Sequence, residues 1–330
     1  MLMSFKNIEK SSRIYYTIIK NGCQDVKSRQ LMNLEENMKF KGIIPALVTP
    51  LNADESINVP VLHKLIGDLL DKKADGFYVG GATGEGLSLR PDERKILAEE
   101  AVKAVGGKVP TIIQVASCDF SVMLDLARHA ESIGADAISA TAPLFFKYDN
   151  DDVYNYYKRL ASATSLPIMM YYSPMAGFPM DANFAARVFE IDNVTAIKWT
   201  SSNYYEMLRL KDLTKGEMNI INGPDEMLLM GLNAGADGGI GTTYNFQMEN
   251  IRGVYDCFHA GKAAEAQEWQ NKANRVIHAL ITKYMGIPAT KVILEEMGYA
   301  VGNAAFPMKV YNDAERAQII ADIRAAGLKI

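Results

Sequence analysis

Hydrophobic residues are arranged in two alternating patterns along most of the chain. Short continuous apolar runs, typical of buried strands, are followed by longer segments in which apolar residues recur with helical spacing. The strands predicted from these runs are residues 43–49, 76–79, 111–115, 137–140, 167–172, 194–198, 218–222 and 238–241. The amphipathic segments between them include residues 59–72, 91–105, 121–132, 151–164 and 203–213.

This alternation predicts the fold class. Eight strand-then-helix units are what a closed (β/α)8 barrel requires. An open doubly wound sheet usually has fewer strands and a glycine-rich fingerprint after the first one, whereas residues 50–54 contain no glycine. We therefore predict an α/β protein built on a single (β/α)8 TIM barrel. Three further helices, at residues 263–282, 289–297 and 314–326, could cover one flank of it.

The first 37 residues do not follow the alternation. They are polar, with scattered basic and hydroxyl side chains and no sustained period. We predict a disordered or loosely helical extension at residues 1–37 and one domain at residues 38–330, because no linker rich in Pro, Gly or Ser interrupts the later chain. A targeting presequence is the weaker interpretation, since acidic residues such as Glu9 and Asp25 dilute the positive charge.

Composition excludes several classes of function. The net charge of −4 gives no basic face for nucleic acid or an anionic membrane, and no apolar run approaches the roughly 20 residues of a membrane span. Three widely separated cysteines indicate a reducing, cytoplasmic compartment and argue against a disulfide framework or a zinc site. The four histidines fall in helical segments away from the strand ends, so we expect no metal site. They are His63, His129, His259 and His278.

Lys198 ends the sixth predicted strand. An unpaired lysine at the end of a buried strand is costly to keep charged, and desolvation favours the neutral amine. A neutral amine is the nucleophile that Schiff-base enzymes use on a carbonyl carbon. The alternative is a strand-end lysine that extends to solvent. Barrel enzymes place their chemistry at the C-terminal ends of the strands, which favours the first interpretation.

Polar and glycine-rich segments follow several other strands and are expected at the same rim. Residues 80–86 could turn their amides toward an anion, with a carboxylate held by the Thr83 hydroxyl; the alternative is a tight turn that merely needs glycine. Tyr171 ends the fifth strand, where its phenol could move protons; the alternative is an aromatic of a barrel layer. Asp225 and Glu226 are expected to begin the helix after the seventh strand, as its cap or as acceptors for a polyol.

Three motifs occur in order along the chain: Gly81-Ala82-Thr83-Gly84-Glu85, Tyr171-Tyr172-Ser173-Pro174 and the strand-six Lys198. Together they resemble the N-acetylneuraminate lyase and dihydrodipicolinate synthase family of class I barrel enzymes that handle pyruvate, over about residues 38–330. Within that family the chain is more similar to the sialic acid lyases. The segments that carry this similarity are Lys198-Trp199-Thr200, Gly223-Pro224-Asp225-Glu226 and residues 238–245.

The resemblance implies reversible cleavage of N-acetylneuraminate to N-acetylmannosamine and pyruvate. Lys198 would form the Schiff base and Tyr171 would help to move the proton from the C4 hydroxyl, with no external cofactor. The residues implied in binding the substrate carboxylate and sugar chain are Ala82, Thr83, Gly84, Thr200, Gly223, Asp225, Glu226 and Thr242. The resemblance also implies a homotetramer whose partner is a small keto-acid sugar, with no nucleic acid or membrane partner.

Three positions depart from the family pattern. Ala82 stands where the lyases usually have a hydroxyl, Phe145 where many members have a tyrosine lent to a neighbouring subunit, and Tyr172 where asparagine is usual. The first two affect the proton relay more than the Schiff base. They keep two alternatives open: another pyruvate-dependent aldolase or dehydratase, similar to dihydrodipicolinate synthase, or a catalytically impaired barrel that binds a keto acid. Against the synthases, Ala176 stands where they carry an arginine that grips a carboxylate.

Overall fold

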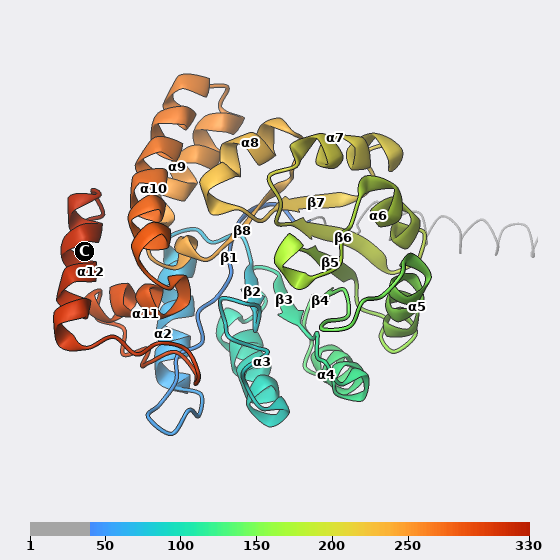
Figure 1. The fold of residues 1–330 in the computed structure, drawn as a ribbon, viewed down its shortest axis with the longest axis horizontal. Coiled ribbons are helices and arrows are strands. Elements are labelled where there is room, and N and C mark those ends of the chain that lie inside the picture. Colours follow the sequence, from blue (N-terminus) through green and yellow to red (C-terminus); the bar gives the residue numbers. More distant parts are fainter. Residues whose placement is uncertain (1–39) are drawn as a thin grey trace, which may run out of the picture. The chain divides into compact units, whose positions relative to one another are not determined.

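The computed structural model describes residues 40–330, which form a barrel of eight parallel strands with helices around it (Figure 1). The predicted extension at residues 1–37 lies outside the described residues. The strands are β1 (Gly42–Pro45), β2 (Phe77–Val79), β3 (Thr111–Gln114), β4 (Ala137–Thr141), β5 (Ile168–Tyr172), β6 (Val194–Trp199), β7 (Asn219–Asn222) and β8 (Gly238–Gly241). The helices are α2 (Val59–Asp71), α3 (Pro91–Val105), α4 (Phe120–Ser132), α5 (Asn150–Ala161), α6 (Ala182–Phe189), α7 (Tyr204–Leu213), α8 (Leu228–Asn233), α9 (Met248–His259), α10 (Ala263–Lys283), α11 (Gly286–Glu296) and α12 (Asp313–Ala325).

The strand order closes the sheet into a barrel. Neighbouring strands pair in parallel in the order β1-β8-β7-β6-β5-β4-β3-β2. Between the two ends of this order, Ala46 forms a parallel bridge with Tyr78, and the Leu47 amide donates to the Tyr78 carbonyl at 2.9 Å. The predicted α/β class and (β/α)8 TIM barrel are confirmed.

Side chains fill the inside of the barrel. Every strand contributes at least one buried residue to a single interior cluster. The cluster consists of Phe40, Ile44, Ala46, Tyr78, Ile112, Ala137, Met169, Ala196, Ile221 and Ile240. Such a packed interior is not a pore, so a substrate has room only at the ends of the strands.

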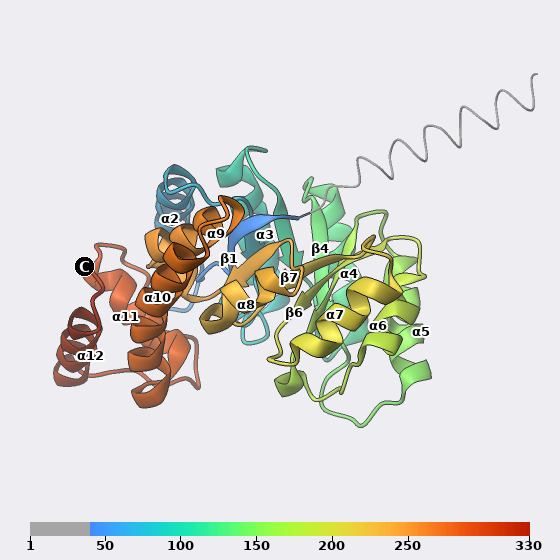
Figure 2. The same ribbon diagram turned by 90° about the horizontal axis from the view of Figure 1, so that it is seen from above.

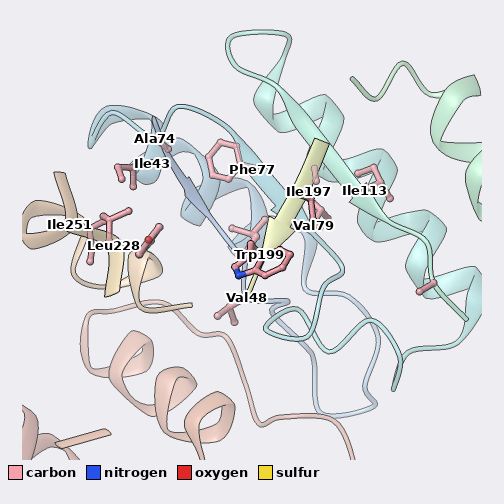
Figure 3. Close-up of a cluster of buried hydrophobic side chains, with 14 of the residues drawn as sticks. Ile43, Val48, Ala74, Phe77, Val79, Ile113, Ile197, Trp199, Leu228 and Ile251 are labelled. Atoms are coloured by element: carbon pink, nitrogen blue, oxygen red, sulfur yellow. The ribbon is translucent and has the colours of Figure 1, made fainter. Parts of the chain in front are cut away.

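The opposite faces of the strands pack against the helices. In Figure 3, Ile197 and Trp199 of β6 lie among apolar side chains that belong to this second, outer cluster. Side chains alternate across a strand, so Ala196 and Lys198 face the inside of the barrel. The apolar run of β6 therefore places its lysine on the inner face, at the C-terminal end.

Three helices follow the eighth repeat. They are α10, α11 and α12, and they lie on the flank of the barrel where α2 and α9 are found (Figure 1, Figure 2). The predicted C-terminal helices are confirmed, with bounds that differ by a few residues. Within residues 40–330, no helix is both long and apolar enough to cross a membrane.

Candidate active site

Lys198 lies at the C-terminal end of β6, where its Cα pairs with Tyr171 on one side and Ile221 on the other. The lysine is only 6% exposed, so its amine does not extend to solvent as a strand-end lysine on the outer surface would. Its Nζ lies 4.4 Å from the centroid of the Tyr171 ring and 4.9 Å from that of Tyr78. It forms no salt bridge with another described residue. Two aromatic faces therefore stabilise positive charge at this nitrogen.

Tyr78 belongs to the site, although the sequence analysis did not select it. Its ring is 1% exposed and meets the Tyr171 ring edge-on, with centroids 6.2 Å apart. Its hydroxyl donates to Ser139 Oγ at 2.9 Å, and burial raises the pKa of Tyr78 far above its ordinary value, so the phenol stays protonated. A polar aromatic at an inward position of the otherwise apolar β2 was the signal that could have identified it.

Thr83 is held in place within the loop that follows β2. Its Oγ1 lies 2.7 Å from Thr242 Oγ1, in the loop after β8, and the side chain is buried. Thr49 Oγ1 donates to the Gly84 carbonyl at 2.6 Å, and a Cβ on Gly84 would lie 2.9 Å from the Leu47 carbonyl oxygen. The glycine is thus required by a close approach of two backbone segments. The structure brings Thr83 and Thr242 together, whereas Ala82 is exposed beside them.

Asp225 and Glu226 begin the helical segment after β7, as the sequence predicted, but its first turn is a 3-10 turn. They open a short 3-10 turn, η2 (Asp225–Met227), and α8 starts only after Met227, which makes no side-chain cap. Asp225 Oδ2 instead accepts two hydrogen bonds from Thr243, one from the amide and one from the hydroxyl, both at 2.7 Å. The side chain of Asp225 thus bonds the loop after β8 and not the amides of its own helical turn.

Burial also changes the acidity of Asp225. Desolvation raises its pKa from 3.8 to about 6, opposed by the bonds from Thr243 and by the nearby charge of Lys198. Glu226 differs from it, because its side chain is exposed and its carboxylate has no hydrogen-bond partner within residues 40–330. Of the two acids, Glu226 is therefore the one that is free to accept hydrogen bonds from a ligand.

Thr200 and Gly223 lie side by side at the ends of β6 and β7. The Gly223 amide donates to the Trp199 carbonyl at 2.9 Å, and a Cβ on Gly223 would lie 1.9 Å from Thr200 Oγ1. The Thr200 hydroxyl is buried and has no hydrogen-bond partner within the described range. The same holds for the Thr141 hydroxyl, on the strand-four residue that pairs with Tyr171. Buried hydroxyls without partners are uncommon and mark a place where a ligand can complete the bonding.

Two of the positions that depart from the family pattern point away from this arrangement. Phe145 has a φ of 77° and is 91% exposed, in the loop that follows β4. Tyr172 packs its ring against Trp199, with centroids 4.7 Å apart, on the outer side of the sheet. Among residues 40–330 there is no group of three or more His, Cys, Asp or Glu side chains arranged to hold a metal ion.

Comparison with known proteins places this geometry in a family. Residues 39–326 match the dihydrodipicolinate synthetase family. The chain is 34% identical to N-acetylneuraminate lyase of Rhizobium meliloti over 284 residues, which is 86% of this chain and 94% of that protein. Its fold superimposes on Proteus mirabilis N-acetylneuraminate lyase with a TM-score of 0.84 and 32% identity, covering 88% of this chain and 100% of the other. A dihydrodipicolinate synthase of Bacillus anthracis gives a TM-score of 0.82 at 26% identity, covering 87% and 98%. This chain belongs to the dihydrodipicolinate synthetase family.

Proposed function

We propose that the protein is a class I aldolase that cleaves N-acetylneuraminate to N-acetylmannosamine and pyruvate through a Schiff base on Lys198. The observation that carries the proposal is the buried amine of Lys198, which faces the inside of the barrel rim between the Tyr171 and Tyr78 rings. The family and the 34% identical relative indicate a lyase of the aldolase type. The choice of substrate rests on the lyases among the relatives.

The first half of the reaction builds an electron sink. The Lys198 amine attacks the C2 ketone, the tetrahedral adduct loses water, and a cationic iminium remains. The faces of Tyr171 and Tyr78 suit a cation at this nitrogen. The substrate carboxylate would lie against the amides of residues 82–84 and the Thr83 hydroxyl, since an amide-lined loop favours an anion.

The second half breaks the carbon–carbon bond. Tyr171 helps to remove the proton of the C4 hydroxyl, the C3–C4 bonding pair moves into the iminium, and N-acetylmannosamine leaves as the aldehyde. The enamine that remains is protonated at C3 and hydrolysed, which releases pyruvate and restores the lysine. No external cofactor is needed in this scheme, because the iminium accepts the electron pair.

The sugar chain would be held at the other side of the rim. The exposed Glu226 carboxylate and the unpartnered Thr200 hydroxyl are the groups best suited to accept and donate hydrogen bonds there. Thr242 would hold the Thr83 hydroxyl in place, and Gly223 would leave room for the Thr200 hydroxyl beside it. Asp225 would act mainly through the Thr243 loop, which its carboxylate already binds.

We also propose that the chain acts as a homotetramer in a reducing, cytoplasmic compartment. Three large apolar side chains, Phe145, Phe146 and Met175, are between 70% and 97% exposed on the loops after β4 and β5. Exposed apolar groups clustered on two adjacent loops favour contact with another protein surface. Sedimentation analysis of the full chain tests the assembly, and a monomer that shows full activity would contradict it.

Turnover with a panel of 2-keto acids tests the proposed reaction. We expect pyruvate release from N-acetylneuraminate to exceed that from shorter 2-keto-3-deoxy acids in kcat/KM. Faster cleavage of a short acid would favour the alternative aldolase of the same family. A stable lysine adduct without any turnover would favour a keto-acid-binding barrel, for which the methyl group of Ala82 and the outward position of Phe145 are the supporting features.

A further inference from the structure

A fully buried ion pair joins the loop after β2 to the C-terminal helices. Lys291 Nζ of α11 lies 2.7 Å from Glu85 Oε1, and the two side chains are 2% and 0% exposed. The Lys291 ammonium also donates to the Asn303 carbonyl at 2.8 Å, and the Ala305 amide donates to Glu85 Oε2. The two contacts of Glu85 connect the β2 loop to α11 and to the segment after it, and the bond from Lys291 to Asn303 ties that segment to α11.

The pair is not explained by stability alone. Removing two charges from water costs free energy that their attraction repays only in part, so a buried pair is weak evidence for stabilisation. Burial lowers the pKa of Lys291, although the charge of Glu85 acts in the opposite direction. The attraction of Glu85 therefore does not fully offset the loss of hydration at the lysine. Glu85 also has a φ of 58°, a left-handed conformation that few residues other than glycine adopt. A buried ion pair and a left-handed backbone are both unfavourable, and such features are typically kept where the position of nearby groups is needed for function.

Glu85 is connected directly to the part of the loop that faces the rim. Its amide donates to the Ala82 carbonyl at 3.0 Å, and Gly86 donates to the Gly81 carbonyl at 3.1 Å, so the loop folds back on itself around Thr83. The same C-terminal segment also bonds the preceding loop, because the Leu51 amide donates to the Val301 carbonyl at 2.9 Å. The C-terminal segment therefore holds the two loops whose backbone surrounds Thr83.

We propose that Glu85 and Lys291 are positioning residues that fix the amides of residues 82–84 for the carboxylate of a 2-keto acid. Neither side chain faces the substrate, and both act through the conformation of the β2 loop. This inference rests on the proposed Schiff-base function. It assigns to α11 a part in substrate recognition, beyond covering one flank of the barrel.

Two ketones separate positioning from general stability. Pyruvate and acetone both form an imine with a lysine, but acetone has a methyl group in place of the carboxylate. We compare the rates at which cyanoborohydride traps each ketone on Lys198. In the wild-type chain we expect trapping of pyruvate to be strongly preferred. Lys291→Met, Glu85→Gln and the milder Glu85→Asp should lower the pyruvate-to-acetone ratio about tenfold or more, since a charged hydrogen-bond network is lost or displaced. Asp is tolerated at positive φ, so Glu85→Asp changes only the reach of the carboxylate.

A double variant and a control complete the test. Glu85→Gln combined with Lys291→Met removes both charges, so its melting temperature should recover relative to the two single variants, whereas the ratio should stay low. Asp75→Asn weakens a charged contact to Arg252 at the opposite end of the barrel and should leave the ratio unchanged. A wild-type ratio in the double variant or in Glu85→Asp would overturn the inference. Absence of any pyruvate adduct in the wild-type chain would instead overturn the proposed function.

Discussion

Two sets of polar side chains, at opposite ends of the barrel, differ in whether they have partners. At the N-terminal end, the aspartates that precede β2, β4 and β8 each accept a hydrogen bond from a backbone amide of a neighbouring strand: Asp75 from Ile43 at 2.7 Å, Asp136 from Thr111 at 2.8 Å, and Asp237 from Ile220 at 3.0 Å. At the C-terminal end, Lys198 has no ion-pair partner and the Thr141 and Thr200 hydroxyls have no hydrogen-bond partner within residues 40–330.

This difference separates stability from function. The three aspartates at the N-terminal end help to hold the strands in register. Each accepts a hydrogen bond from a backbone amide that would otherwise be buried without a partner. Polar groups without partners at the other end lower the stability of the ligand-free protein. That free energy is regained when a ligand supplies the missing hydrogen bonds. Substitutions of these aspartates should therefore change stability with little effect on turnover, and substitution of Lys198 should do the reverse.

The largest effect is expected for Lys198→Ala. Loss of the nucleophile should lower kcat for pyruvate release by at least about 10⁴-fold, because the other groups of the site act through the Schiff base. The melting temperature should stay within a few degrees of the wild-type value, since no ion pair is broken. Lys158→Ala, at an exposed position of α5, serves as the control and should remain fully active. Substantial turnover by Lys198→Ala would show that another group carries the chemistry.

The opposite result is expected for Asp237→Ala. It removes the acceptor for the Ile220 amide and for Asn219 Nδ2, along with a salt bridge to Lys211. We expect a loss of about 2–3 kcal/mol in the free energy of unfolding, measured by urea denaturation, with kcat per folded molecule unchanged. Asp237→Asn keeps one acceptor and should lose less. A large fall in kcat per folded molecule would show that Asp237 is needed for turnover as well as for stability.

Asp225→Asn should change how stability depends on pH. The pKa of Asp225 is higher in the folded protein, about 6 against an ordinary 3.8, so the folded state holds this proton more tightly than the unfolded state. The protonated Asp225 therefore adds to the free energy of unfolding below about pH 4. This contribution, up to roughly 3 kcal/mol, is lost as the pH rises through 6.

The amide side chain introduced by Asp225→Asn has no proton to lose, so the variant should gain in stability relative to the wild type as the pH rises from about 4 to about 7. Urea denaturation at several pH values measures this difference, with the surface variant Asp192→Asn as the control. A difference in stability that does not change with pH would mean that Asp225 titrates near its ordinary value.

A smaller and selective effect is expected for Glu226→Ala. A hydrogen bond to a charged acceptor is worth about 1.5–3 kcal/mol, so KM for N-acetylneuraminate should rise about tenfold or more. KM for a short 2-keto acid should change little, because it does not reach this side of the rim. Glu217→Ala, which is exposed near the start of β7, should have no effect on either substrate. Equal weakening of both substrates would remove Glu226 from the sugar site.

Most of the fold could be predicted because burial leaves a clear pattern in the sequence. All eight strands were predicted from their apolar runs, and β8 has the predicted bounds. The first strand was predicted to reach residue 49 but ends at Pro45, since beyond it the chain turns from β8 toward β2 through the Ala46–Tyr78 bridge. Helices α6, α8 and α9 were not among the segments named, and the first two have only eight and six residues, too few to show a strong period.

The site could be predicted only in part. Lys198, Tyr171 and Thr83 were selected because each ends or follows a strand, and the barrel brings such positions to one rim. The bond between Asp225 and Thr243 could not be predicted, since it joins two loops whose conformations no local pattern fixes. Lys291 lies within an apolar helical run, and a charge at such a position is a signal for a buried partner. The identity of that partner, Glu85, required the structure.

Trapping with pyruvate and cyanoborohydride, followed by peptide mass spectrometry of the full chain, shows directly whether Lys198 is the Schiff-base lysine. We expect one covalent adduct, on Lys198, because among the lysines of residues 40–330 that amine alone combines burial, a place at the barrel rim and the ring faces of Tyr171 and Tyr78. The adduct should be absent in Lys198→Ala. An adduct on a different lysine, or no adduct under conditions in which the protein cleaves its substrate, would show that Lys198 does not form the Schiff base.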